Sequence, residues 1–189
     1  MSERQLRVVV IGAGMSGILA GIKLLESGIR DLTIYEKADR IGGTWRENTY
    51  PGLTCDVPSH HYTYSFARNP DWSRFFPAGA EIQDYFERTC ARYGVDRLIR
   101  FGEEIARAEY RDGGWHMRTK SGREDRADVV IAATGVLHHP RFPDIPGVES
   151  FAGAIFHTAR WDHSVPLDGK RVGVVGCGST GVQDRKSVV

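Results

Sequence analysis

The sequence predicts an α/β protein with a parallel sheet, in which a unit of alternating strands and helices is followed by the start of a second such unit. Two observations carry this prediction. The motif G-x-G-x-x-G occurs twice, at residues 12–17 and 176–181, and each copy directly follows a short apolar run. After the first copy come a helical pattern and a second apolar run that ends in an acidic residue, Glu36. A strand, a glycine loop, a helix and an acid in this register indicate a dinucleotide site.

The first motif is expected to connect a strand to a helix. Residues 7–12, RVVVIG, are rich in β-branched side chains and suit a strand that is buried on both faces. Gly12 permits the tight turn, and Gly14 lets a pyrophosphate approach the backbone. Gly17 lets the helix pack closely on the strand. The three glycines therefore have separate structural roles in one loop.

The residues after this loop complete the first unit. Residues 16–27 carry apolar side chains at helical intervals, and residues 32–36, LTIYE, are expected to form the next strand. Glu36 lies 24 residues after Gly12, where a carboxylate can accept hydrogen bonds from ribose hydroxyls. An alternative for residues 8–22 is a signal peptide, but the dinucleotide loop accounts better for their four glycines.

The rest of the chain suits the same class. Residues 80–95 read as an amphipathic helix with Ile82, Tyr85, Phe86 and Thr89 along one face. Residues 99–135 read as strands separated by glycines and charged turns, a β-meander that ends in the apolar strand DVVIAATG. A proline-punctuated linker follows, and GKRVGVVGCGSTG is expected to start the second Rossmann unit.

Composition excludes several classes of function. With 41% hydrophobic residues, 26% charged residues and a net charge of +1, the chain has no basic stripe for nucleic acid or an acidic membrane surface. The three cysteines, Cys55, Cys90 and Cys177, form no C-x-x-C pair, which excludes a flavin disulfide reductase with an adjacent redox dithiol. Their odd number favours a reducing compartment, and a cytoplasmic location is expected.

Residues 42–66 form a long stretch rich in glycine and aromatic residues. Long ordered loops inside a compact domain usually carry function. The stretch reads Gly-Gly-x-Trp, four residues, Tyr-Pro-Gly, three residues and then Asp56. This order resembles a fingerprint of type I Baeyer–Villiger monooxygenases. Members of that family bind FAD at the first glycine loop and NADPH at the second.

Residues 151–162, FAGAIFHTARWD, resemble a second signature of the same family, F-x-G-x-x-x-H-x-x-x-W-[P/D]. The related flavin-containing monooxygenases, which oxygenate amines and sulfides, usually end that signature in Tyr or Phe. Trp161 and Asp162 therefore favour the Baeyer–Villiger branch. In the family His157 couples movements of the two nucleotide domains. The alternative is that His157 and Trp161 only pack a domain boundary.

The resemblance implies roles for individual residues. Asp56 and His157 are expected to take part in catalysis. The residues expected to bind FAD are Gly12, Gly14, Ser16, Gly17, Glu36, Gly43, Thr44, Trp45, Asp56, Tyr62 and Ile105. The residues expected to bind NADPH are Gly176, Gly178, Ser179, Thr180 and Gly181. No metal is expected, because the adjacent histidines at 60–61 and 138–139 would point to opposite faces of an extended chain.

The resemblance also divides the chain. Residues 1–140 correspond to a Rossmann-like FAD-binding domain with its meander, and residues 141–168 to a linker that carries the second signature. Residues 169–183 correspond to the start of an NADPH-binding domain. Residues 184–189, DRKSVV, depart from the family pattern and match the translation of a common sequencing adapter, so they are expected not to be native.

The function implied by the resemblance is insertion of one oxygen atom from O2 into a ketone, giving an ester or lactone, with FAD and NADPH as cofactors. In the family an arginine beside the flavin, held by the residue matching Asp56, stabilises negative charge, and this chain does not include it. Little turnover is therefore expected from the 189 residues, which leaves an FAD-binding fragment as one alternative. Oxygenation of sulfides or amines is the other, and no protein partner is indicated.

Overall fold

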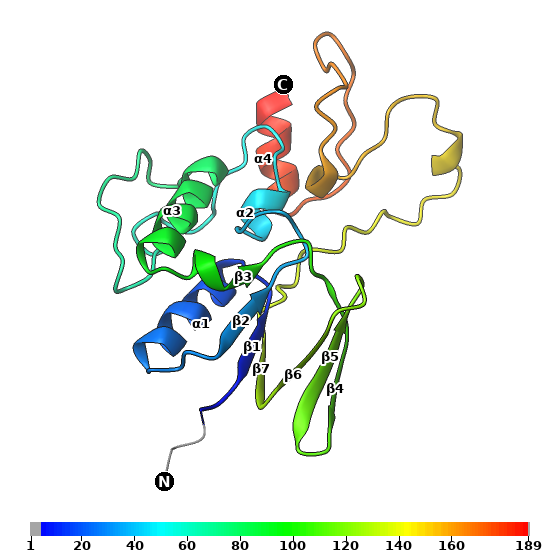
Figure 1. The fold of residues 1–189 in the computed structure, drawn as a ribbon. Coiled ribbons are helices and arrows are strands. Elements are labelled where there is room, and N and C mark those ends of the chain that lie inside the picture. The colour runs from blue at the N-terminus through cyan, green and yellow to red at the C-terminus, as the bar shows by residue number, and fades with distance from the viewer. Residues whose placement is uncertain (1–4, 189) are drawn as a thin grey trace. The chain divides into compact units, whose positions relative to one another are not determined.

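The computed structural model describes residues 5–188, with side chains described as far as Asp184. The chain forms two compact units. The first contains the chain up to Gly43 together with Asp84–Gly135, and the second contains Thr44–Gln83 and the chain from Val136 onward. The course of the chain can be followed in Figure 1. The first glycine motif therefore belongs to the first unit and the second motif to the second unit.

A four-stranded parallel sheet with the order β3-β2-β1-β7 forms the centre of the first unit. Its strands are β1 (Val8–Ile11), β2 (Leu32–Tyr35), β3 (Ile99–Arg100) and β7 (Val129–Ala132). Strand β1 pairs on both sides, since Val8 is in register with Leu32 and with Val129. Its three valines are buried. The predicted strand buried on both faces is confirmed.

Helix α1 (Met15–Glu26) begins directly after the first glycine motif. Its side chains Ile18 and Ile22 are buried in the core. A Cβ at Gly21 would lie 2.7 Å from the Val95 side chain and 3.0 Å from that of Ile34 in β2. Helix α1 therefore packs closely on these two side chains. Residues 8–22 thus form a strand and part of a helix. Among the described residues, none of the helices is both long enough and apolar enough to span a membrane.

Helix α3 (Gly79–Arg92) is followed by the 3-10 helix η1 (Asp96–Leu98). The four residues predicted to share its apolar face are all buried: Ile82, Tyr85, Phe86 and Thr89. The helix ends before Gly94, whose φ of 67° lies in the left-handed region that glycine tolerates. The amphipathic helix predicted at 80–95 is therefore confirmed, with its end set by this glycine.

The predicted meander is an antiparallel sheet of three strands, in green in Figure 1. Its strands are β4 (Ile105–Arg111), β5 (Gly114–Thr119) and β6 (Glu124–Ala127). Asp112 and Gly113 both have positive φ, which suits the tight turn between β4 and β5. Met117 and Ala127 pack in one buried cluster with Val9 and Tyr35 of the parallel sheet.

Polar contacts also fasten the meander to the parallel sheet. Arg7 donates to Asp125 on β6 at 2.6 Å and to Asp31 at 2.7 Å. The Tyr35 hydroxyl donates to the same Asp125 carboxylate at 2.7 Å, and burial raises the pKa of Tyr35 to about 12. Burial alone would raise the pKa of Asp125, but its hydrogen bonds from Arg7 and Tyr35 outweigh burial and hold that pKa below the usual value.

The second unit contains less regular structure. Its elements are α2 (Thr44–Glu47), η2 (Val148–Ser150), η3 (Thr158–Arg160), α4 (Ser179–Val188) and the first turns of α3. The apolar run before the second motif forms no strand, and Val175 is 74% exposed. A strand requires a neighbour to complete its hydrogen bonds, and the described part of this unit contains only isolated bridges.

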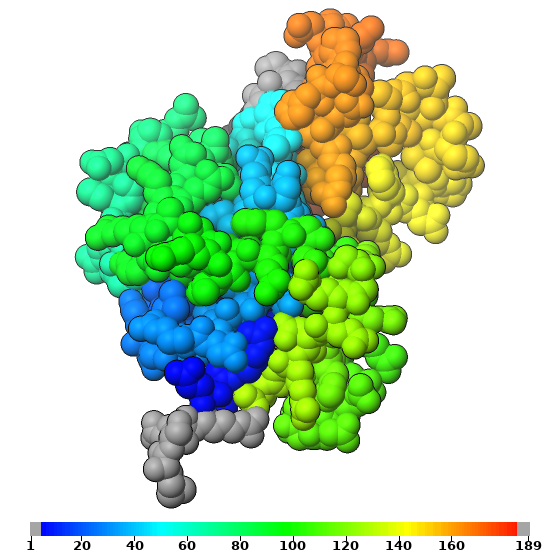
Figure 2. Space-filling model, viewed as in Figure 1, coloured from blue at the N-terminus to red at the C-terminus, as the bar shows by residue number. Residues whose placement is uncertain are grey.

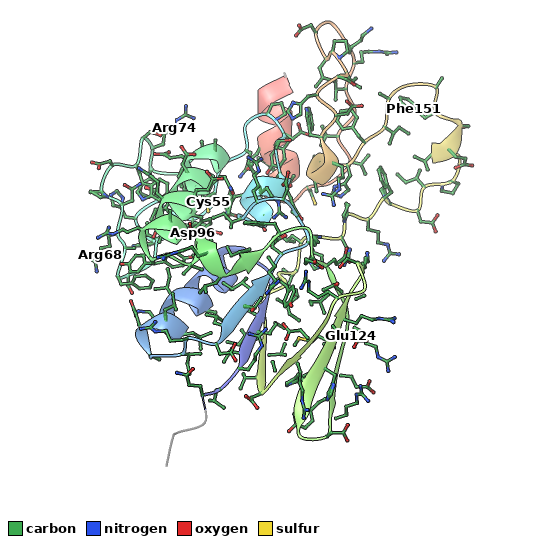
Figure 3. All side chains as sticks on the ribbon, in the orientation of Figure 1. Cys55, Arg68, Arg74, Asp96, Glu124 and Phe151 are labelled. Atoms are coloured by element: carbon green, nitrogen blue, oxygen red, sulfur yellow. The ribbon has the colours of Figure 1, made fainter. Side chains whose placement is uncertain are left out.

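Large apolar side chains are exposed along residues 136–175, the yellow to orange part of Figure 2. They are Val136, Leu137, Phe142, Ile145, Phe151, Ile155, Val172 and Val175. Phe151, which opens the second predicted signature, is labelled in Figure 3 on the long loop that carries it. Within this segment, helical structure is limited to the single turns η2 and η3.

Candidate functional site

The first glycine loop is shaped by close approaches within the first unit. A Cβ at Gly12 would collide with the carbonyl oxygen of Ala133, and φ at Gly12 is 103°. A Cβ at Gly17 would collide with the carbonyl oxygen of Gly12, so only glycine lets α1 start so near the strand. Gly14 differs, because its φ of −80° is ordinary and a Cβ there would meet its nearest atom at 3.6 Å. Packing and backbone conformation therefore do not require glycine at position 14.

Glu36 lies against this loop. It directly follows β2 and is buried, and its carboxylate accepts hydrogen bonds from the backbone N–H of Ala13 at 2.8 Å and of Ala38 at 3.0 Å. The structure thus brings Glu36, which is expected to bind the ribose, next to the loop that is expected to bind the pyrophosphate. Here the carboxylate orders the loop backbone, a role that the sequence pattern did not indicate.

The remaining predicted residues of the first unit occupy different places. Gly43 packs against Gly14, with 3.3 Å between its ideal Cβ position and the Gly14 Cα, and its φ is 54°. The glycine backbones at positions 14 and 43 are therefore in contact directly before the first residue of α1. Ser16 is exposed in the first turn of α1, and Ile105 begins β4 beside the core cluster.

In the second unit, the aromatic pair of the first fingerprint is in contact. The Trp45 indole N–H donates to the Tyr62 hydroxyl at 3.0 Å, and the two rings meet edge to face with centroids 5.5 Å apart. Burial raises the pKa of Tyr62. Thr44 begins the short helix α2, in which Trp45 is the second residue. Both predicted aromatic residues thus lie together.

Asp56 and Ser179, far apart in the sequence, also meet in this unit. The Ser179 hydroxyl donates to the Asp56 carboxylate at 2.8 Å, where Ser179 is the first residue of α4. Figure 3 labels Cys55, the residue directly before Asp56. A predicted flavin-edge residue and a predicted NADPH-binding residue are therefore direct neighbours.

Three residues of this site were not predicted from the sequence. The side-chain oxygen of Gln183 accepts hydrogen bonds from the Tyr50 hydroxyl at 3.0 Å and from the Thr54 backbone N–H at 3.3 Å. The available signal was the spacing, because Gln183 follows Ser179 by one helical turn and shares its face of α4.

The second glycine loop repeats part of the geometry of the first. Gly176 has a φ of 133°, and a Cβ at Gly181 would lie 2.7 Å from the Gly176 carbonyl oxygen. A Cβ at Gly178 would meet nothing within 4 Å, and its backbone lies outside the left-handed region. No packing requirement explains the glycine at position 178 or at position 14, although a Cβ at position 14 would be in ordinary contact with Gly43. Thr180 follows in the first turn of α4 and hydrogen-bonds to Tyr50.

His157 acts locally in the described structure. Its Nδ1 accepts the backbone N–H of Ala159 at 3.1 Å and caps the 3-10 helix η3. The Phe142 ring meets its imidazole edge to face at 5.9 Å between centroids. Asp162 accepts two hydrogen bonds from Ser164, which lower the pKa of Asp162. These are local contacts within partly exposed turns, and the catalytic role of His157 stays a prediction.

One structural reason given for expecting no metal is wrong. The rings of His138 and His139 lie 4.0 Å apart instead of pointing to opposite faces. The chain bends at residues 136–139 and is not extended there, so the alternation of a strand does not apply. Within the described part of the chain, no three His, Cys, Asp or Glu side chains are grouped so that they could hold a metal ion.

The two loops share one chemical property. The first backbone N–H groups of a helix have no acceptor within the helix, and the helix dipole favours an anion there. In α1 the first helical bond runs from Ile18 N–H to Gly14, and in α4 it runs from Val182 N–H to Gly178. The amides between these glycines and the first bonded residues suit a phosphate at either loop. The residues present therefore fit two dinucleotides.

Comparison with known proteins supports this arrangement. A family model described as pyridine nucleotide-disulphide oxidoreductase matches residues 9–184. An uncharacterized monooxygenase of Mycobacterium tuberculosis is 58% identical over 97% of this chain and 37% of its own length. A Baeyer–Villiger monooxygenase of Streptomyces coelicolor is 44% identical over 96% of this chain and 35% of its own length. The chain thus spans little more than a third of these curated relatives.

Solved structures agree. Cyclohexanone monooxygenase from Rhodococcus bound to NADP+ superimposes with a TM-score of 0.86 at 39% identity, over 97% of this chain and 36% of that one. OTEMO in complex with FAD and NADP gives a TM-score of 0.87 at 34% identity, over 97% of this chain and 37% of that one. The α/β Rossmann-type fold predicted from the sequence is confirmed. The chain belongs to the pyridine nucleotide-disulphide oxidoreductase family although it carries no C-x-x-C pair, and its relatives include an uncharacterized monooxygenase and a Baeyer–Villiger monooxygenase.

Proposed function

We propose that the chain holds FAD at the first glycine loop and NADPH at the second, as part of a monooxygenase that inserts oxygen into a ketone. The observation that carries this proposal is the hydrogen bond between Asp56 and Ser179. It joins the fingerprint expected at the flavin to the loop expected to bind the nicotinamide nucleotide. Similarity to cyclohexanone monooxygenase bound to NADP+ and to OTEMO in complex with FAD and NADP supports the assignment of both cofactors.

The chain's own residues would bind and orient these cofactors. The paired glycine backbones at Gly14 and Gly43 and the first amides of α1 would hold the FAD pyrophosphate, and Glu36 would accept hydrogen bonds from its ribose hydroxyls. The corresponding backbone at Gly178 and the first amides of α4 would hold the pyrophosphate of NADPH. When bound, the reduced flavin supplies the activation of dioxygen. Asp56 would hold a positively charged side chain that stabilises the negative charge developing at the reacting groups.

Two matched glycine variants test the cofactor assignment. In Gly14→Ala the new Cβ makes an ordinary contact with Gly43 at 3.6 Å, so the fold is retained while a methyl group is added between the two glycines that would meet FAD. In Gly178→Ala the Cβ meets no protein atom within 4 Å. We expect Gly14→Ala to weaken FAD binding and Gly178→Ala to weaken NADP+ binding, each at least about tenfold, because a hydrogen bond to a charged group contributes about 1.5–3 kcal/mol.

The control is Gly173→Ala, which lies outside the loop and also has no atom within 4 Å of its ideal Cβ. Flavin fluorescence quenching and NADP+ titration measure the two affinities. FAD binding to Gly14→Ala as tight as to the unaltered chain would contradict the assignment of the first loop. Unaltered NADP+ binding to Gly178→Ala would contradict that of the second.

The oxygenation itself is proposed for the whole protein of which these residues form part. For the 189 residues we propose cofactor binding with little turnover, since they span about 37% of a relative such as the Mycobacterium tuberculosis monooxygenase. NADPH consumption with and without a ketone tests this directly. Rapid ketone-dependent oxidation by the 189-residue chain would overturn it. Product analysis on the whole protein then separates esters or lactones from sulfoxides or amine oxides.

A further inference from the structure

The loop of residues 50–56 is attached to one face of helix α4 by side-chain hydrogen bonds. Gln183 Oε1 accepts from the Tyr50 hydroxyl at 3.0 Å and from the Thr54 N–H at 3.3 Å. Ser179 Oγ donates to Asp56 Oδ2 at 2.8 Å. Ser179 and Gln183 are four residues apart, so both side chains project from the same face of the helix. The first, middle and last parts of the loop are therefore all tied to the first turns of α4.

The opposite side of the loop is fixed by backbone hydrogen bonds. The Cys55 N–H donates to the Pro77 carbonyl at 2.9 Å, and the Gly79 N–H donates to the Leu53 carbonyl at 3.0 Å. Asp56 itself lies outside these backbone contacts, and its side chain is exposed. The direction of its carboxylate thus depends on how the loop lies on α4.

Gln183 is suited to this attachment because both of its partners are donors. Tyr50 is only 5% exposed, so its hydroxyl requires an acceptor within the protein. The Tyr50 hydroxyl is protonated at neutral pH and can donate, and burial raises its pKa still further above neutrality. The Thr54 N–H likewise needs an acceptor, because the loop forms no ladder on this side. One amide oxygen with two lone pairs meets both requirements.

We propose that Gln183 is a positioning residue, which holds the loop of residues 50–56 on helix α4 and thereby sets the orientation of the Asp56 carboxylate. The consequence for catalysis rests on the proposed function, since Asp56 is the residue expected at the flavin. Because the first turn of α4 is also the expected site of the NADPH pyrophosphate, the same helix would carry the nucleotide and align Asp56.

Amide exchange at Thr54 tests the attachment without any cofactor. In Gln183→Leu the acceptor oxygen is lost with little change in side-chain volume, and we expect the Thr54 amide to exchange roughly tenfold faster by NMR. In Gln183→Glu an acceptor oxygen remains, and exchange should stay within about threefold of the unaltered chain. Val182→Ala is the matched control, since Val182 is the neighbouring residue of α4 and is exposed.

Rescue by glutamate separates positioning from a general loss of stability. Faster exchange at Thr54 in Gln183→Leu with unchanged exchange in β1 and β5 supports the proposal. Unchanged exchange at Thr54, or equal acceleration in Gln183→Leu and Gln183→Glu, overturns it. Should Gln183→Leu fail to fold, Tyr50→Phe takes its place. That variant removes one buried donor, and it should accelerate exchange at Leu53 and Thr54 at least about threefold, with no acceleration overturning the proposal.

NADP+ titration then addresses the consequence. We expect Gln183→Leu to weaken NADP+ binding severalfold and Gln183→Glu to restore part of it, because the helix would lose the loop that braces its first turn. If the unaltered chain bound no NADP+, the proposed function would fail, whereas the Thr54 exchange rates would still decide the role of Gln183. If NADP+ bound equally to all variants while Thr54 exchange changed, the attachment would stand and its effect on the nucleotide would be refuted.

Discussion

The two glycine loops have the same sequence spacing and very different surroundings. In both, the first glycine has a left-handed φ and the third lies against the carbonyl oxygen of the first. Both loops also begin a helix with the same first hydrogen bond, from Ile18 to Gly14 and from Val182 to Gly178. Yet a Cβ at Gly12 would collide with Ala133, whereas a Cβ at Gly176 would meet nothing within 4 Å.

The difference lies in what each loop is attached to. The first loop follows β1, which has a paired strand on each side, and the second follows an apolar run that forms no strand. The motif therefore determines the turn and the helix start by itself, because both depend on residues within six positions of each other. The close contacts around the first loop come from the sheet, which pairs β1 with strands far away in the sequence.

The largest difference between the loops should appear at their third glycines. In Gly17→Ala the methyl group collides with the Gly12 carbonyl beneath a packed helix, and we expect a loss of about 4 kcal/mol in the free energy of unfolding. In Gly181→Ala the Cβ stands 2.7 Å from the Gly176 oxygen with open space around the loop, and we expect about 1 kcal/mol. Urea denaturation followed by circular dichroism measures both. Equal losses would show that the two loops are equally constrained.

The first residue bonded in each helix gives the second comparison. Ile18 is fully buried and Val182 is 50% exposed. Ile18→Ala should cost about 3 kcal/mol, because it removes core contacts and leaves a cavity. Val182→Ala should change stability by less than about 0.5 kcal/mol. A loss in the free energy of unfolding as large in Val182→Ala as in Ile18→Ala would mean that α4 is packed as closely as α1, contrary to the comparison of the two glycine loops.

The stabilisation gained by attaching the meander to the parallel sheet should depend on pH. Asp125→Asn is expected to cost about 2 kcal/mol at pH 7, because it weakens the partly buried contacts with Arg7 and Tyr35. The pKa of Asp125 is lower in the folded chain than in the unfolded chain, so its stabilisation is complete above the unfolded value of about 3.9 and is lost as pH falls through the folded value. Stability curves of the unaltered chain and Asp125→Asn should therefore converge in acid, and parallel curves would argue against this ion pair.

Asp184 in α4 should have the opposite effect on the free energy of unfolding, because its ionised carboxylate should destabilise the fold. It is buried, its Oδ1 has no hydrogen-bond partner among the described residues, and burial raises its pKa. A raised folded pKa means that the ionised carboxylate destabilises the fold at neutral pH and that this penalty disappears below the unfolded value of about 3.9. We expect Asp184→Asn to stabilise the chain by about 1 kcal/mol at pH 7 and to have little effect at pH 3. Destabilisation at pH 7 would show that the carboxylate has a favourable partner.

The sequence was sufficient to predict structure where the pattern within a few residues agrees with the contacts that these residues make in the fold. The valines of β1, the glycines at 12 and 17 and the acid at 36 each satisfy a rule that holds over a few residues, and together they define the first unit. The face of α3 was likewise predicted, because helical periodicity and burial agree at Ile82, Tyr85, Phe86 and Thr89.

Other features depend on contacts that no local pattern encodes. Gln183 carries no motif, and its role follows from the meeting of α4 with residues 50–56. The apolar run before Gly176 has the composition of a strand, but the described part of the second unit offers no strand for it to pair with. The expectation that His138 and His139 point to opposite faces was wrong, because the backbone bends there and is not extended. Composition indicates what a segment can form, and its neighbours decide whether it does.

The three thiols of the chain differ in a way that gives experimental access to the second loop. Cys55 and Cys90 are buried, and burial raises the pKa of Cys55 and raises that of Cys90 to about 12, so at neutral pH both are overwhelmingly protonated and shielded. Cys177 is exposed between Gly176 and Gly178. A maleimide dye added at neutral pH should therefore attach at Cys177, where a fluorophore would report directly on the arrival of a nucleotide.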